Sequence, residues 1–245
     1  MGITTVAVID TETTGLEPDD GAAVLEVGVV LLNMEDTGDR EGWFFTGQSF
    51  ANYVEFDGII PPEARAVHHI APELVKVGSP GCLSREELVR RLLKFEKPDM
   101  VYAAHNAQFD KKFLPELTLP WICTRQCSRH IWPDAPNHKN QTLRYWLEVE
   151  PPREMLVGLD PHRARYDAAV TGAILKRMLD EHSVDELIRL TNKPVLLKIC
   201  NFKKHKGQPW SEVPRDYLNW MVREGVAKSD PDLQYTVDFY LGRAA

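Results

Sequence analysis

The sequence predicts an α/β protein with a mixed sheet, followed by a small C-terminal module. Three apolar segments open the chain and are joined by short turns rich in Gly and Asp, a pattern typical of an antiparallel meander. After the meander, strand-like segments alternate with helical patterns, which indicates the α/β class. Beyond Pro194 the composition changes, and basic and aromatic residues become interleaved. We therefore expect one large domain and one small one.

The meander is predicted to use residues 6–9, 22–32 and 43–45. The second of these segments is too apolar and β-branched to be an edge strand. Pro61 and Pro62 then fix an extended entry into a short helix, because proline is well tolerated in the first helical turn.

The spacing of Ser84 and Glu87 is that of a capping box, which predicts a helix over residues 85–95. A short buried strand is expected over residues 100–104, and Asn106 can cap the helix that follows it. The later elements are predicted as a strand at residues 121–124 and helices at residues 125–131, 141–147 and 163–178.

Two acids, Asp10 and Glu12, end the first predicted strand one residue apart. Because residues i and i+2 of a strand share a face, their carboxylates project together, about 6 to 7 Å apart along the strand. Carboxylates this close repel each other, so they share a proton or bind a cation, and hard oxygen ligands suit Mg²⁺ or Mn²⁺. Taken alone, the two acids are also compatible with a strand that simply ends in a polar turn.

Length and composition are those of a globular protein with a full core, at 245 residues, 43% hydrophobic and 27% charged. No apolar run approaches the roughly 20 residues of a membrane span, and no signal-peptide pattern opens the chain, so we expect a cytoplasmic protein. Four cysteines are too few for a disulfide framework.

The net charge of −7 is unevenly distributed along the chain. From Asn192 onward there are nine Lys and Arg against six Asp and Glu, a net charge of +3, whereas the preceding residues carry 20 against 30, a net charge of −10. An acidic body with a basic C-terminal part is an asymmetry that favours contact with an anionic partner through that part.

His162 precedes Asp167 by five residues, at the start of the last long helical pattern. Positions five apart on one continuous helix differ by about 140° and do not share a face. We therefore expect His162 on the loop before the helix, from which it can fold back toward Asp167.

Three segments, VIDTETTGL, AHNAQFD and HRARYDA, resemble in order the three motifs of the DEDD family of 3′→5′ exonucleases. The spacing from His162 to Asp167 is similar to that of the His-bearing subclass. Residues 60–64, residues 143–147 and the C-terminal module resemble exonuclease X-like proteins more narrowly. The resemblance covers nearly the whole chain and implies a ribonuclease H-like fold, with a mixed five-stranded sheet flanked by helices.

By this resemblance, the chain is expected to bind two Mg²⁺ ions, with Mn²⁺ as a substitute, at Asp10, Glu12, Asp110 and Asp167. Asp10, Glu12 and Asp167 would hold the first ion, Asp10 would share the second, and Asp110 would act through a bound water. Two such cations, roughly 3.5 to 4 Å apart, would stabilise charge on the attacking and leaving oxygens of a phosphodiester. His162 would be the general base that deprotonates the attacking water.

The turn after the two acids is expected to meet the 3′-terminal nucleotide, with Leu16 stacked on or wedged beside the last base. Core packing is the alternative interpretation for Leu16 and Phe109. The residues expected to bind substrate are Thr13, Thr14, Gly15, Leu16, His105, Asn106 and Phe109.

The exonuclease domain is expected over residues 1–190 and an accessory module over residues 194–245. In the module, residues 201–210 have the pattern of a hairpin with a basic tip, and residues 214–222 that of an amphipathic helix. Basic residues interleaved with aromatic ones suit nucleic-acid binding, by backbone contact and base stacking. A small core with a solvated face of lysines is an equal alternative.

The expected function is metal-dependent removal of nucleoside 5′-monophosphates from 3′ ends of nucleic acid, with DNA as the expected substrate and without a membrane partner. An exoribonuclease of the same superfamily is the alternative, because discrimination by the 2′-hydroxyl depends on the shape of the groove. A non-catalytic nucleic-acid-binding adaptor is a third interpretation, against which the complete set of acids argues.

Overall fold

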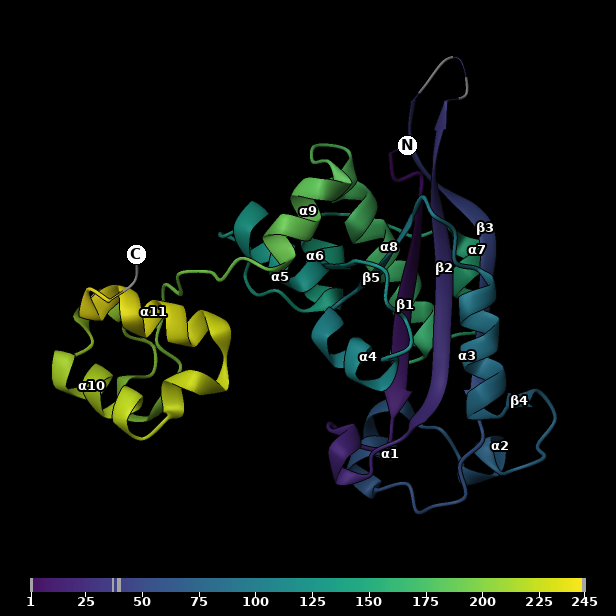
Figure 1. Cartoon of the computed structure of the whole chain (residues 1–245), viewed down its shortest axis with the longest axis horizontal. Coiled ribbons are helices and arrows are strands. Elements are labelled where there is room, and N and C mark those ends of the chain that lie inside the picture. Colours follow the sequence, from purple (N-terminus) through teal and green to yellow (C-terminus); the bar gives the residue numbers. More distant parts are fainter. Residues whose placement is uncertain (1, 37, 39–40, 244–245) are drawn as a thin grey trace. The chain divides into compact units, whose positions relative to one another are not determined.

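The computed structural model describes residues 2–36, 38 and 41–243 and divides into two units, Met1–Thr191 and Asn192–Ala245 (Figure 1). Among the described residues, no helix is both long enough and apolar enough to cross a membrane. The first unit contains a sheet with the strand order β4-β3-β2-β1-β5-β6. Its strands are β1 (Thr5–Thr13), β2 (Val24–Asp36), β3 (Glu41–Val54), β4 (Cys82–Leu83), β5 (Met100–Ala104) and β6 (Trp121–Cys123).

The sheet is mixed, as predicted. Strands β1, β2 and β3 form the expected antiparallel meander, and β5 and β6 extend it in parallel beside β1. Within the described residues the sheet has six strands and not the expected five, because Cys82 and Leu83 pair with the end of β3. A two-residue strand carries no periodic signal, so the sequence pattern could not indicate it.

The predicted helices are present, with small changes at their ends. Ser84 and Glu87 form the predicted capping box, in which the Ser84 hydroxyl accepts a hydrogen bond from the Glu87 backbone N–H. Asn106 occupies the expected N-cap position but in a left-handed conformation, and its side chain does not cap the helix. The helices of this unit are α1 (Pro62–His68), α2 (Pro72–Val75), α3 (Arg85–Lys94), α4 (Ala107–Phe113), α5 (Thr124–Ile131), α6 (Asn140–Trp146), α7 (Arg153–Leu156), α8 (Ala164–Leu179) and α9 (Val184–Thr191), with a 3₁₀ turn η1 (Pro18–Asp20).

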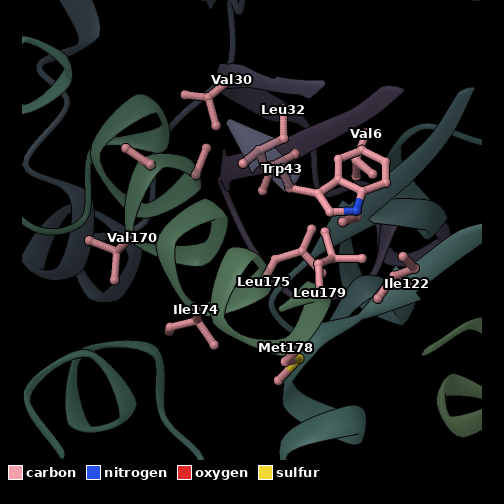
Figure 2. Close-up of a cluster of buried hydrophobic side chains, with 14 of the residues drawn as sticks. Val6, Val30, Leu32, Trp43, Ile122, Val170, Ile174, Leu175, Met178 and Leu179 are labelled. Atoms are coloured by element: carbon pink, nitrogen blue, oxygen red, sulfur yellow. The ribbon is translucent and has the colours of Figure 1, made fainter. Parts of the chain in front are cut away.

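Two apolar layers cover the two faces of the sheet. Alternation along β1 sends Val6 and Val8 into the layer that contains α8, and Ala7 and Ile9 into the layer that contains α3 and α4. Figure 2 shows the first layer, in which Trp43 of β3 lies near Leu175 and Leu179 of α8. The even-numbered residues of β1, including the two acids at its end, therefore face α8.

The second unit has a separate core around Trp210, Met221 and Val237. The expected hairpin over residues 201–210 is wrong in detail: a single bridge joins Ile199 to Pro209, and a 3₁₀ turn forms the tip. The helices of this unit are η2 (Lys203–His205), η3 (Trp210–Glu212), α10 (Arg215–Arg223), η4 (Val226–Ser229) and α11 (Pro231–Leu241), of which α10 matches the predicted amphipathic helix.

Candidate active site

The site is built on the carboxyl end of β1. Asp10 and Glu12 project from one face of this strand, and in the antiparallel pairing with β2 they lie opposite Gly28 and Glu26. Asp10 is partly buried and Glu12 is buried. The spacing of the two acids thus gives the shared face that the sequence predicted, and it directs both carboxylates toward the first turn of α8.

Asp167 joins these two acids from the first turn of α8. Asp10, Glu12 and Asp167 each offer an oxygen, and these three oxygens lie within 4.8 Å of one another. Gly28 permits the approach of α8 to the sheet, because a Cβ at this position would lie 2.1 Å from the Arg165 backbone nitrogen. A side chain at position 28 would therefore push the first turn of α8 away from Asp10.

Asp110 reaches the site from the other layer and lies outside that group of three. It is buried in the first turn of α4, and the Thr11 hydroxyl donates a 2.9 Å hydrogen bond to its Oδ1. Thr11 follows Asp10 on β1, and the side chains of neighbouring strand residues point to opposite faces of the sheet. The bond from Thr11 therefore holds the Asp110 carboxylate beside the group of three acids and not within it.

Burial dominates the electrostatics of the four carboxyl groups. Desolvation, followed by repulsion from the neighbouring acids, raises the pKa of Asp10 well above its ordinary value and that of Glu12 to about 9. Desolvation also raises the pKa of Asp110 to about 7 and raises that of Asp167. Grouped acids of this kind retain protons unless positive charge compensates them, and hard carboxylate oxygens suit a divalent cation, so the residues present fit a metal site.

His162 lies on the loop before α8, as predicted, with a left-handed backbone (φ 64°). Its backbone N–H donates a 2.9 Å hydrogen bond to Asp167 Oδ2, and its Nδ1 is 4.0 Å from the same oxygen. Gln141 of α6 donates to the other oxygen, Asp167 Oδ1, at 3.1 Å. The His162 side chain is 59% exposed, so the hydrogen bond of its backbone N–H holds the residue in place more than contacts of its ring do.

The turn after the acids is held by its own threonines. The Thr13 hydroxyl donates to the Gly15 carbonyl at 2.7 Å, and the Thr14 hydroxyl accepts from the Ala23 backbone N–H at 2.9 Å. Leu16 follows this rigid turn with 75% of its surface exposed, which excludes the alternative that it packs in the core.

The three other predicted substrate-binding residues follow β5, with His105 and Asn106 on the turn after the strand and Phe109 in the first turn of α4. His105 has both ring nitrogens bonded within the protein, to Thr124 Oγ1 and to the His138 carbonyl, each at 2.9 Å. Burial lowers its pKa to about 4, so the ring is neutral near neutral pH. Asn106 Oδ1 accepts from Arg125 at 3.3 Å, and Phe109 packs partly buried beside the α3–α4 layer. Both ring nitrogens of His105 are therefore already occupied, which leaves the face of the ring for contact with a substrate.

Sequence reasoning missed Glu26, which is 2% exposed and lies in β2 opposite Glu12. Arg163, between His162 and α8, donates from Nε and Nη2 to the two Glu26 oxygens, at 3.0 and 2.8 Å. A single acid within the apolar segment of residues 22–32 was the available signal, but its partner lies 137 residues away.

Comparison with known proteins places this geometry in a family. Residues 7–175 match the RNase T model, which describes exonucleases. Exodeoxyribonuclease 10 of Escherichia coli K12 is 29% identical over 241 residues, which cover 96% of this chain and 97% of that protein. A DNA polymerase III subunit epsilon-like protein of Rhodobacter capsulatus is 29% identical over 183 residues, 71% of this chain and 24% of that protein.

Solved structures agree with these matches. Exonuclease X in complex with 5′ overhanging duplex DNA superposes with a TM-score of 0.57 at 25% identity, over 76% of this chain and 99% of that one. Escherichia coli exonuclease I with a dT13 oligonucleotide, at 14% identity and a TM-score of 0.53, covers 76% of this chain and 43% of its own and supports the fold alone. The chain belongs to the RNase T exonuclease family, and within it is a DEDD-type exonuclease close to exonuclease X.

Proposed function

We propose that the protein is a metal-dependent 3′→5′ exonuclease that acts on DNA and releases nucleoside 5′-monophosphates. The observation that carries the proposal is the group of three carboxylate oxygens, from Asp10, Glu12 and Asp167, within 4.8 Å of one another. A non-catalytic adaptor would gain nothing from burying these acids together, because the group destabilises the fold unless it binds a cation.

Asp10, Glu12 and Asp167 would hold one Mg²⁺ ion, Asp10 would share a second, and Asp110 would contribute through a water molecule. Mn²⁺ would substitute, since both cations take oxygen ligands. When bound, two such ions stabilise the charge that develops on the attacking and leaving oxygens of the phosphodiester. The family is dependent on divalent metals, in agreement with this assignment.

His162 would take a proton from the attacking water as that oxygen forms a bond to the terminal phosphorus. The bond from phosphorus to the 3′ oxygen of the preceding nucleotide would then break, and that oxygen would take a proton from solvent, which gives a shortened strand with a 3′-hydroxyl and a nucleoside 5′-monophosphate. The exposed imidazole beside Asp167 suits this role, because it reaches solvent and is anchored next to the acids. The rigid turn ending in Leu16 would contact the terminal base.

DNA is favoured as the substrate because the relative matched over 96% of the chain is an exodeoxyribonuclease. RNA remains the alternative, since the 2′-hydroxyl is read by contacts in the substrate groove.

We further propose that the second unit grips the nucleic-acid backbone. The ammonium groups of Lys203 and Lys204 lie 5.3 Å and 5.6 Å from the ring centroids of Trp220 and Tyr217, and Lys206 is exposed beside them. Lys203 and Lys204 each cover one face of an aromatic ring, so a base cannot stack on that face. Contact of these lysines with phosphate groups is therefore favoured over base stacking.

The experiment follows hydrolysis of matched DNA and RNA oligonucleotides, single- and double-stranded, labelled at either the 3′ or the 5′ end. With Mg²⁺, the proposal expects an immediate 3′-labelled mononucleotide and a 5′-labelled ladder that shortens step by step. Asp10→Asn and EDTA should each abolish hydrolysis, by at least about 10³-fold, since the cations supply several kcal/mol of transition-state stabilisation. Release of the 5′ label as the first product, or undiminished cleavage in EDTA, would contradict it.

A further inference from the structure

We propose that Glu26 and Arg163 form a clamp that positions His162 for catalysis. The inference rests on the proposed function, because it assigns the clamp to the base of that reaction. Glu26 is a buried carboxylate beside the three grouped acids, directly opposite Glu12 in the strand register. Both its oxygens are bonded to Arg163, so its charge is already matched within the protein.

The clamp is part of a row across three strands. Glu12 in β1 pairs with Glu26 in β2, and Glu26 pairs with Tyr53 in β3. The Arg163 guanidinium joins the last two residues of this row, because its Nη2 also donates a 2.6 Å hydrogen bond to the Tyr53 hydroxyl and its Cζ lies 5.3 Å from the centre of the Tyr53 ring. Two parallel N–H donors to one carboxylate fix the orientation of the guanidinium as well as its position.

A carboxylate also holds the backbone on each side of Arg163, and one of the two carboxylates is Glu26 of the clamp. The Ala164 N–H donates a 3.2 Å hydrogen bond to Glu26 Oε2, which ties the start of α8 to β2. On the other side, His162 donates its N–H to Asp167. His162 is thus bonded to Asp167 by its own N–H, and the two residues that follow it are bonded to Glu26.

His162 needs such support because its ring has few contacts of its own. Its side chain is 59% exposed, and the ion-pair distance from Nδ1 to Asp167 is 4.0 Å. Its left-handed backbone is an uncommon conformation for a residue other than glycine and persists where the surroundings enforce it. Loss of the clamp should therefore let the His162 backbone move, and a displacement of about 1 Å can cost about 10²-fold in rate.

The test measures kcat, KM and melting temperature of the full-length protein on a 3′-labelled oligonucleotide with Mg²⁺. Glu26→Gln should lower kcat by about 10- to 10²-fold with KM within about twofold. Tyr53→Phe, which removes one acceptor of Arg163, should lower kcat several-fold. In a His162→Ala background, Glu26→Gln should cause no further loss, since residues that act as a unit are non-additive. An equal loss in both backgrounds would overturn the clamp.

Folding effects are separated by two further variants. Glu26→Gln/Arg163→Gln removes both charges of the pair, so its melting temperature should recover relative to either single variant while kcat stays low. Arg85→Gln, which breaks the 2.8 Å pair with Glu116 at the start of α3, should leave kcat unchanged. A kcat that recovers together with the melting temperature would show the pair to be only structural.

The two possible failures are distinguishable. If His162→Ala keeps the wild-type kcat, the proposed base is wrong, and the clamp is wrong with it. If His162→Ala is impaired but Glu26→Gln, Tyr53→Phe and Arg163→Lys all keep the wild-type kcat, the clamp alone is overturned.

Discussion

The two units carry their charge in opposite ways. The first, with a net charge of −10 before Asn192, buries acids together at one end of a strand, where Glu12 is 9% and Asp110 is 3% exposed. The second, with a net charge of +3, keeps Lys203, Lys204 and Lys206 exposed. Buried acids require a specific counter-charge, whereas exposed lysines are satisfied by solvent and salt. The first unit is thus suited to chemistry at a fixed point and the second to diffuse attraction.

This difference predicts that single substitutions at the site in the first unit will lower the rate of hydrolysis strongly. His162→Ala should lower kcat by about 10²- to 10⁴-fold, the range for loss of a general base, with substrate binding little changed. The acid limb of the pH–rate profile should disappear with it. Steady-state kinetics over a pH series measures both effects.

His182→Ala is the matched control, because that histidine pairs with Glu186 at 3.2 Å on α9 and has no place in the proposed reaction. Wild-type kcat and an unchanged acid limb in His162→Ala would assign the base to another group.

A second prediction concerns stability in the absence of metal. The pKa of Glu12 rises from its ordinary value of 4.5 to about 9, and that of Asp110 from 3.8 to about 7. Between these values the folded state binds more protons than the unfolded state, so stability falls as pH rises from about 4 to about 9.

Urea melts in EDTA at several pH values measure this slope. Asp10→Asn should flatten it, because one repelling charge is gone, and Mg²⁺ should restore the stability of the wild-type protein at high pH. Metal-free stability that rises through the same pH range would contradict the electrostatic account.

The smallest effect is expected in the second unit. Replacing Lys203, Lys204 and Lys206 together by Ala should weaken binding while sparing kcat at saturating substrate. The slope of log affinity against log salt should flatten by up to about 0.7 per lost contact on single strands and about 0.9 on duplex. Titration of a labelled oligonucleotide in Ca²⁺ at several salt concentrations checks this.

Replacement of the same three lysines by Arg keeps the charge and is the matched control, which should bind with the wild-type salt slope. If the Ala variant also keeps the wild-type affinity and slope, the lysines are only a solvated face of the small core around Trp210.

Sequence reasoning succeeded where the relevant geometry is local. The shared face of Asp10 and Glu12 follows from strand alternation, and the place of His162 before α8 follows from the helical period. Strand alternation and the helical period can both be recognised within a few consecutive residues.

It failed where the geometry depends on how distant elements meet. The pair of Glu26 with Arg163 requires the register of β1 with β2 and the docking of α8 over Gly28, which no local pattern contains. The bonds of His105 to Thr124 and to the His138 carbonyl are likewise contacts between separate segments. The long strands and helices were thus predictable, whereas the two-residue strand β4, the turn over residues 201–210 and the partners that support the site were not.

The central claim is that Asp10, Glu12 and Asp167 form a binding site for divalent cations, and calorimetric titration of Mn²⁺ into the metal-free protein tests it most directly. The wild-type protein should show saturable binding that releases protons at neutral pH, because acids with raised pKa values must deprotonate to bind the ion, so the observed heat should depend on the buffer. Asp10→Asn and Asp167→Asn should bind far more weakly. Saturable binding of equal strength in both variants, or none in the wild-type protein, would contradict the account.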